Sequence, residues 1–285
     1  MPSIASFRGL RYDPAHVGAI SQVIAPPAEA IDPDLQAQLY EQPPANVVRL
    51  ELNREEPGDS DRSNRYTRAA KFLKSWRDQG VLMQEPAAAL YVYHQLFDLE
   101  GRRHIVRGVL ARVQLESFET DYHSRQKSPT PAACEDRLLL TRTCRANLSP
   151  ILGHYADSEG EAQATLDAAV SSQPALEADD ILGVTHRLWP LTDQTVTAQV
   201  AGLIGPQPLV ITAGFACYEA ACRYRDELAA THAKANDGAD LPTDHPANFV
   251  LMMLVGNDEA GGQPAATAGF ASPLPASGLV LNLLQ

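Results

Sequence analysis

Apolar side chains recur at two different periods along this chain, and each period predicts a different kind of element. Between residues 63 and 79 they lie three and four positions apart, which is the period of an amphipathic helix. Residues 88–97 and 103–115 are rich in β-branched and aromatic side chains and flank a turn-like linker, so they predict an antiparallel hairpin. Residues 46–52 alternate between apolar and polar from Val48 onward, which predicts a strand.

The second half of the chain alternates between the two kinds of element. A polar, proline-containing segment at 116–133 predicts a functional or mobile loop. The elements predicted after it are helices at 134–146, 159–171, 194–203 and 218–234 and strands at 151–155, 183–189, 208–212 and 249–255. With a short helix near 32–40 and a hairpin-rich part over 1–115, the pattern predicts an α+β fold, a mixed β-sheet with flanking helices, as one domain over residues 1–255.

The last thirty residues lose this periodicity. Residues 256–277 are rich in glycine, alanine and proline, so we expect 256–285 to form a poorly ordered tail. Residues 279–284 alone have the composition of a short strand. The change in composition suggests a C-terminal truncation or a change of reading frame.

Charge narrows the classes of partner. The 285 residues include 23 basic and 35 acidic ones, a formal charge of −12, which disfavours binding to nucleic acid or to an anionic membrane. The longest apolar run, 249–255, is far shorter than a membrane span, and the N-terminus lacks a signal-peptide pattern, so we expect a cytoplasmic protein. The four cysteines do not have the paired spacing of a zinc site and are expected to be small, reduced core residues.

Several motifs occur in an order that resembles a known family. They are Arg8-Gly9-Leu10-Arg11-Tyr12-Asp13, Ala25-Pro26-Pro27, Pro44-Ala45-Asn46-Val47-Val48-Arg49-Leu50, Ala89-Leu90-Tyr91-Val92-Tyr93-His94-Gln95, Glu135-Asp136-Arg137-Leu138, Ala146-Asn147-Leu148-Ser149-Pro150-Ile151, Thr185-His186-Arg187-Leu188-Trp189 and Tyr218-Glu219-Ala220. Over residues 5–255 the chain resembles the bacterial family called domain of unknown function 1015, whose members are often labelled SpoOJ/ParB-like. That family is similar to the ParB and sulfiredoxin superfamily. The resemblance implies a core of that kind, a site for nucleotide phosphate, and transfer of a phosphoryl group from ATP or ADP, with magnesium, to a small hydroxyl substrate such as serine.

The family signature that would hold the phosphate, Asp-Gly-His-His-Arg, is altered in this chain. The matching residues are Ala213, Gly214, Phe215, Ala216 and Cys217, so only the glycine remains. Gly214 and the start of the following helix are still able to hold an anion through backbone N–H groups. Cys217 is either a thiolate nucleophile at this helix start or a small buried residue.

Other candidate residues come from the same resemblance. His123 matches a family histidine ahead of the Asp-Arg pair, but the residues after it do not match, so it is either catalytic or a solvated loop residue. Asp136 and Arg137 are either a phosphate-facing pair or structural residues at a helix start. His186 and Arg187 either line the same pocket or form the polar face of a strand.

Three functions stay open at this point. The first is a degenerate, non-catalytic paralogue of a nucleotide-dependent phosphotransferase that keeps the scaffold. The second is an active kinase or phosphotransferase with His123 and Asp136 as catalytic residues and Gly214, Cys217, Arg137, His186 and Arg187 around the phosphate. The third, a DNA-binding regulator, is opposed by the acidic charge.

Overall fold

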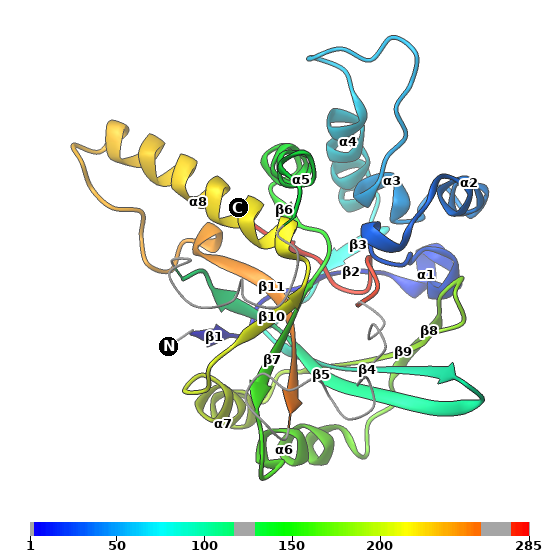
Figure 1. The fold of residues 1–285 in the computed structure, drawn as a ribbon, viewed down its shortest axis with the longest axis vertical. Helices are drawn as coiled ribbons and strands as arrows, with labels where there is room; N and C mark the ends of the chain where they lie inside the picture. The colour runs from blue at the N-terminus through cyan, green and yellow to red at the C-terminus, as the bar shows by residue number, and fades with distance from the viewer. Residues whose placement is uncertain (1–2, 117–128, 258–274, 285) are drawn as a thin grey trace.

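A mixed β-sheet forms the centre of the protein. The computed structural model describes residues 3–116, 129–257 and 275–284, and His123 lies outside these ranges. The sheet has eight strands among the described residues, in the order β10-β7-β11-β5-β4-β9-β8 with β1 added to β5 (Figure 1). Its strands are β1 (Ile4–Ala5), β4 (Leu90–Leu99), β5 (Arg102–Gln114), β7 (Ile151–Ala156), β8 (Leu176–Asp179), β9 (Thr185–Leu191), β10 (Val210–Ala213) and β11 (Phe249–Asn257).

The pairing of the strands is mostly antiparallel. β4 and β5 form the predicted hairpin, with Tyr91 opposite Leu110 and Leu99 opposite Arg102. β11 lies antiparallel to β5 and parallel to β7, which makes the sheet mixed. The predicted α+β class with a mixed sheet is therefore confirmed.

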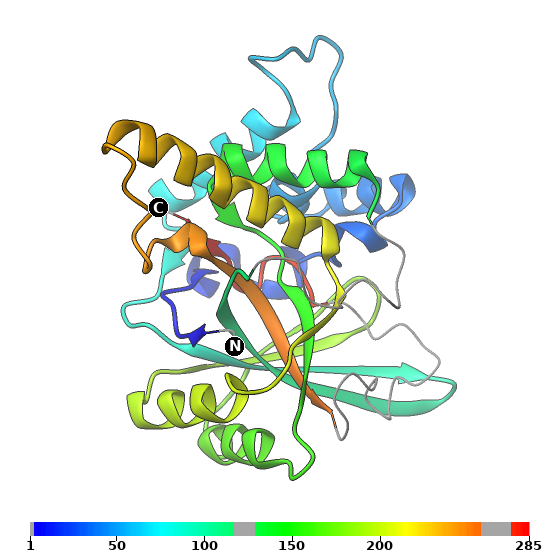
Figure 2. The ribbon, with the colours of Figure 1, turned by 60° about the vertical axis from the view of Figure 1, so that its left-hand side comes forward.

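Helices cover the sheet in two groups (Figures 1 and 2). The α6 and α7 helices lie together on one side, whereas α2 to α5 form a layer on the other, and α8 packs along α5. The α-helices are α1 (Pro14–Val17), α2 (Pro33–Glu41), α3 (Val48–Glu51), α4 (Arg65–Asp78), α5 (Pro131–Cys144), α6 (Glu161–Val170), α7 (Gln194–Ile204) and α8 (Phe215–Ala235). Short 3-10 turns are η1 (Ile20–Gln22), η2 (Ala28–Ala30) and η3 (Pro246–Asn248). None of the helices among the described residues has the length and apolar character needed to cross a membrane.

The strand predicted at 46–52 is wrong, because this segment forms the short helix α3. The side chain of Asn46 donates to the carbonyls of Gln22 and Ile24 and accepts a bond from the N–H of Val48 (3.0 Å). These bonds hold the backbone in a turn. Since Val48 and Leu50 are both fully buried, alternation over so few residues does not distinguish a strand from a buried helical turn.

The α5 helix begins inside the segment predicted as a loop. Thr130 caps it by accepting a bond from the N–H of Ala133, and Pro131 occupies the first turn. The predicted start at residue 134 is therefore three residues too late. Threonine and proline at these positions are common at helix starts and were the signal for the earlier boundary.

The expectation of a poorly ordered C-terminal tail is wrong for residues 275–284. Leu281 exchanges two backbone hydrogen bonds with Leu10 of β2 (Leu10–Tyr12), each 2.9 Å long. The short strand predicted at 279–284 is present as β12 (Asn282–Leu283), which pairs with β6 (Ala146–Asn147). On its other side, β2 pairs with β3 (Leu82–Gln84). The C-terminal segment thus links two small two-stranded sheets, β12-β6 and β2-β3, and Leu281 is completely buried.

Candidate functional site

A partly buried ionic network joins three elements of the helical layer. Glu51 ends α3, Arg65 and Tyr66 begin α4, and Asp136 and Arg137 lie in the first half of α5. Each is placed by its helix: the side chain of Asn64 caps α4, and Thr130 caps α5. Because the helices pack side by side in this layer, side chains far apart in sequence converge.

Arg137 is the centre of this network. Its Nη1 donates to Glu51 Oε1 (2.7 Å), and its Nη2 donates to the backbone carbonyl of Glu51 (3.3 Å). Its Nε and Nη2 both donate to Asp136 Oδ2, at 2.9 and 2.5 Å. Only 9% of Arg137 and 2% of Glu51 are exposed. The guanidinium is therefore held by two carboxylates of the same chain.

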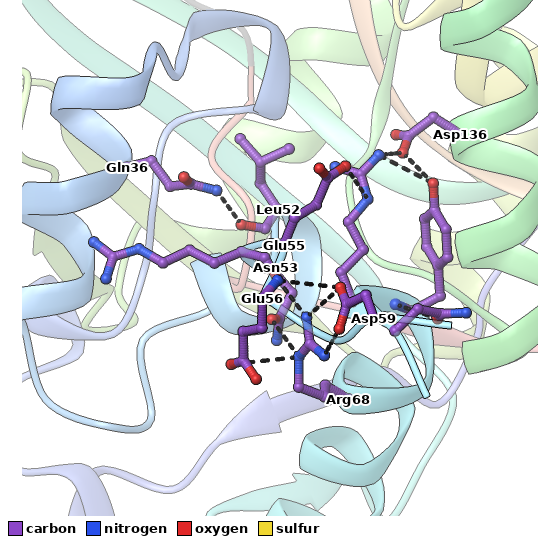
Figure 3. Close-up of polar contacts among 12 residues, drawn as sticks. Gln36, Leu52, Asn53, Glu55, Glu56, Asp59, Arg68 and Asp136 are labelled. Carbon is purple, nitrogen blue, oxygen red and sulfur yellow. Dashed lines mark hydrogen bonds and ion pairs between the residues drawn. The ribbon is translucent and has the colours of Figure 1, made fainter. Parts of the chain in front are cut away.

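Asp136 has a second set of partners (Figure 3). Its Oδ1 accepts a hydrogen bond from the hydroxyl of Tyr66 (2.8 Å) and pairs with Arg65. Burial alone would raise the pKa of Asp136, but Arg137, Tyr66 and Arg65 outweigh it and lower the pKa. Two guanidinium groups face two carboxylates, so the formal charges of the network cancel.

The surroundings of Glu51 disfavour the ionised form of its carboxyl. Burial raises the pKa of its carboxyl, and the charge of Arg137 only partly offsets that effect. A small cavity adjoins it, lined by residues that include Arg137, Ser149 and Cys217. Ser149 connects this region to the C-terminal segment through a 2.7 Å hydrogen bond to the hydroxyl of Ser277.

The loop ahead of α4 is fastened by Arg68 (Figure 3). This guanidinium donates to both carboxylate oxygens of Asp59 (2.5 and 3.0 Å) and to the carbonyl of Arg54 (2.6 Å). The bonds fix the loop against the first turns of α4 and so support the position of Arg65 beside Asp136.

The altered signature turn lies between β10 and α8. Gly214 has φ +81°, and a Cβ atom there would come within 3.2 Å of the Cα of Ile151, so both the backbone and the space require glycine. Cys217 lies in the first turn of α8 and faces the cavity next to Arg137. Burial raises the pKa of the Cys217 thiol far above its ordinary value, with only a partial opposing effect of Arg137. The direction of this shift disfavours a thiolate at neutral pH and so opposes the role of activated nucleophile.

His186 and Arg187 point to opposite faces of β9, as neighbouring residues of a strand do. His186 is 1% exposed, and its Nδ1 lies 2.7 Å from the hydroxyl of Tyr93. Its Nε2 lies 3.2 Å from the carboxylate of Asp180. Arg187 instead pairs on the surface with Glu177 at 2.6 Å. Neither residue lines the cavity beside Arg137.

The structure thus brings together Asp136, Arg137 and Cys217 of the predicted residues and separates His186 and Arg187 from them. Glu51, which completes the network, is not among the predicted site residues. It directly follows the family-like motif that ends at Leu50, and this position was the available signal. Among the described residues no cluster of three histidine, cysteine or acidic side chains has the arrangement of a metal site.

The fold is α+β, and the network of its helical layer is a balanced set of arginines and carboxylates. Comparison with known proteins identifies the family. The family model described as "Protein of unknown function (DUF1015)" matches residues 4–263, so the chain belongs to this family. No curated protein and no solved structure matches the chain.

Proposed function

We propose that this chain is a non-catalytic member of its family, which keeps the scaffold of a ParB-like nucleotide-dependent phosphotransferase, in the cytoplasm, but does not transfer phosphoryl groups. The main support for the proposal is that the guanidinium of Arg137 donates its hydrogen bonds to the carboxylates of Glu51 and Asp136. A phosphate-binding arginine needs donors that face the ligand, whereas four of the five N–H groups of this guanidinium are used within the chain.

The chemistry of the signature turn supports the same proposal. The positions that carry aspartate, two histidines and arginine in relatives hold Ala213, Phe215, Ala216 and Cys217 here. Alanine and phenylalanine supply neither a proton nor a charge, and the raised pKa of Cys217 disfavours its thiolate. Phosphoryl transfer depends on positioning and on neutralising the phosphate charge, and this turn offers only backbone groups for either task.

The alternative is an active phosphotransferase that acts on a small hydroxyl substrate such as serine and uses His123 as its base. Incubation of the purified chain with ATP or ADP, magnesium and serine, followed by mass spectrometry for phosphoserine, separates the two. The proposal predicts no product above the level without enzyme. Turnover that disappears in His123→Ala and persists in the surface control His232→Ala would establish the active enzyme instead.

A DNA-binding regulator is the least supported function. The formal charge of −12 opposes a polyanion, and Arg137 and Arg65 are both neutralised inside the chain. A gel-shift titration with random-sequence duplex at low salt is expected to show no complex.

A further inference from the structure

A cavity of about 450 Å³ lies between the end of α5 and the second half of α8, two helices that pack against each other (Figures 1 and 2). Its volume falls in the range of roughly 300–1,000 Å³ that is usual for ligand sites. His245, just before η3, and Leu284 of the C-terminal segment complete its lining. These lining residues differ from those of the small cavity beside Arg137, so a ligand here is independent of the proposed function.

Arg145 lines this cavity from the C-cap position of α5. Its backbone is left-handed, with φ 51° and ψ 47°, a conformation that favours glycine and strains a residue with a side chain. Its N–H donates to the carbonyl of Thr141 (2.8 Å), and its carbonyl accepts from the N–H of Leu284 (2.9 Å). The guanidinium is exposed and has no hydrogen-bond or ion-pair partner among the residues that the structure describes. The chain therefore carries an arginine at a strained position without using its charge in the fold.

Tyr224 and His245 place two more donors at the cavity. Only 5% of Tyr224 is exposed, and its hydroxyl has no hydrogen-bond partner in the described ranges. Burial raises the pKa of Tyr224 and the charge of Arg145 partly opposes this, so the hydroxyl and the guanidinium are close enough to interact. The Nδ1 atom of His245 accepts a hydrogen bond from the N–H of Ala247 (3.2 Å), which leaves the proton of the neutral ring on Nε2. In the described parts of the chain, Nε2 has no partner for this proton.

The other polar groups of the cavity are used within the chain. Arg142 donates from Nε and Nη2 to the two carboxylate oxygens of Glu227, at 3.0 and 2.6 Å, so their charges cancel. The hydroxyl of Thr231 donates to the carbonyl of Glu227 (2.8 Å). With His245 neutral, the free charge is +1, from Arg145 alone. One negative charge balances it, whereas a dianionic phosphate would bring uncompensated charge beside Glu227.

We propose that this cavity binds a small organic monocarboxylate with an apolar body. The carboxylate accepts two parallel hydrogen bonds from the guanidinium of Arg145 and further bonds from the Tyr224 hydroxyl and His245 Nε2. These bonds suit a carboxylate, which has about four acceptor positions. The apolar body packs against Leu228 and Leu284, which line the same cavity.

Hexanoate and its neutral amide, hexanamide, test this proposal on the full chain. Titration followed by amide NMR is expected to shift the resonances of Arg145, Thr231 and His245 with hexanoate, with a Kd of about 5 mM or tighter. Hexanamide has the same shape without the charge and is expected to bind about tenfold more weakly or less. No shift at about 20 mM hexanoate, or equal affinity for hexanamide, would overturn the proposal.

Two glycine variants test the contact with Arg145. Arg145→Gly removes the guanidinium and places glycine where the backbone favours it, so this variant is expected to fold. Its affinity for hexanoate is expected to fall about tenfold or more. The control Arg62→Gly removes an exposed arginine from the loop ahead of α4 and is expected to leave the affinity unchanged. Equal losses in the two variants would overturn the assignment of Arg145, with circular dichroism verifying both folds.

Hexyl phosphate tests the charge that the cavity accepts. At about pH 7.5 it is largely dianionic and is expected to bind the unmodified chain more weakly than hexanoate does. Glu227→Gln removes the charge that neutralises Arg142 and is expected to strengthen hexyl phosphate by about tenfold. Tighter binding of hexyl phosphate than of hexanoate to the unmodified chain would overturn the monocarboxylate and indicate a phosphate ligand.

Discussion

Replacing Arg137 by alanine is expected to destabilise the protein strongly. The substitution removes the partner of a carboxylate that is 2% exposed, and it also takes two hydrogen bonds from Asp136. Breaking a buried ion pair by removing one partner costs about 3–5 kcal/mol, because the other charge stays buried. Urea unfolding followed through the fluorescence of Trp76 and Trp189, both buried, measures the loss.

A double-mutant cycle assigns this loss to the pair. Glu51→Gln keeps the shape of the side chain and is expected to cost less, about 1–3 kcal/mol, since Arg137 retains Asp136. The loss in the double variant is expected to be smaller than the sum of the two single losses, with a coupling of about 0.5–3 kcal/mol. Arg187→Ala, which breaks an exposed pair with Glu177, is the control and is expected to cost under about 1 kcal/mol. A loss for Arg137→Ala no larger than for Arg187→Ala would refute the reasoning that Arg137 serves the fold.

Two further outcomes follow from the same contacts. Burial opposes the ionisation of Asp136, but Arg137, Tyr66 and Arg65 hold its pKa below the ordinary value of 3.8. The ionised Asp136 therefore stabilises the fold above about pH 3.8, and this contribution is lost as the pH falls through the lower pKa of the folded state. Asp136→Asn is expected to be less stable than the unmodified chain at pH 6 and to flatten the acid side of the stability profile, and an unchanged slope below about pH 4 would contradict this assignment. Gly278→Ala and Gly58→Ala both place a side chain at φ +93°, at a cost of about 1–2 kcal/mol, but only at Gly278 does the new Cβ meet a neighbour, Val47 at 3.0 Å. Thermal unfolding is expected to show an additional loss of about 1–3 kcal/mol for Gly278→Ala, and equal losses would mean that the C-terminal segment is not packed against the core.

Long periodic segments were predictable from the sequence, whereas the short helix α3 was not. The β4–β5 hairpin and α4 are long, so the period of their apolar residues is clear even where a single position departs from it. The α3 helix has four residues and is set by bonds from Asn46, which no periodicity expresses. The composition of the last thirty residues predicted a tail, but Leu281 is buried because strands supplied by distant parts of the chain flank it.

The candidate site was predictable only in part for a related reason. Asp136, Arg137 and Cys217 were selected by family motifs, and helix packing places them around one region. The neutralisation of Arg137 by Glu51 depends on how α3 packs against α4 and α5, which is a tertiary property. The separation of His186 from Arg187 follows from strand alternation and was accessible from the sequence once residues 183–189 were assigned to a strand.

A calorimetric titration of the unmodified chain with ADP and with ATP, each with magnesium, tests the central claim most directly. If the carboxylates of Glu51 and Asp136 occupy Arg137 in place of a phosphate, no binding heat is expected at nucleotide concentrations up to about 1 mM. A Kd in the micromolar range that weakens about tenfold or more in folded Arg137→Lys, and not in Arg187→Lys, would show that Arg137 serves a nucleotide and would contradict the account.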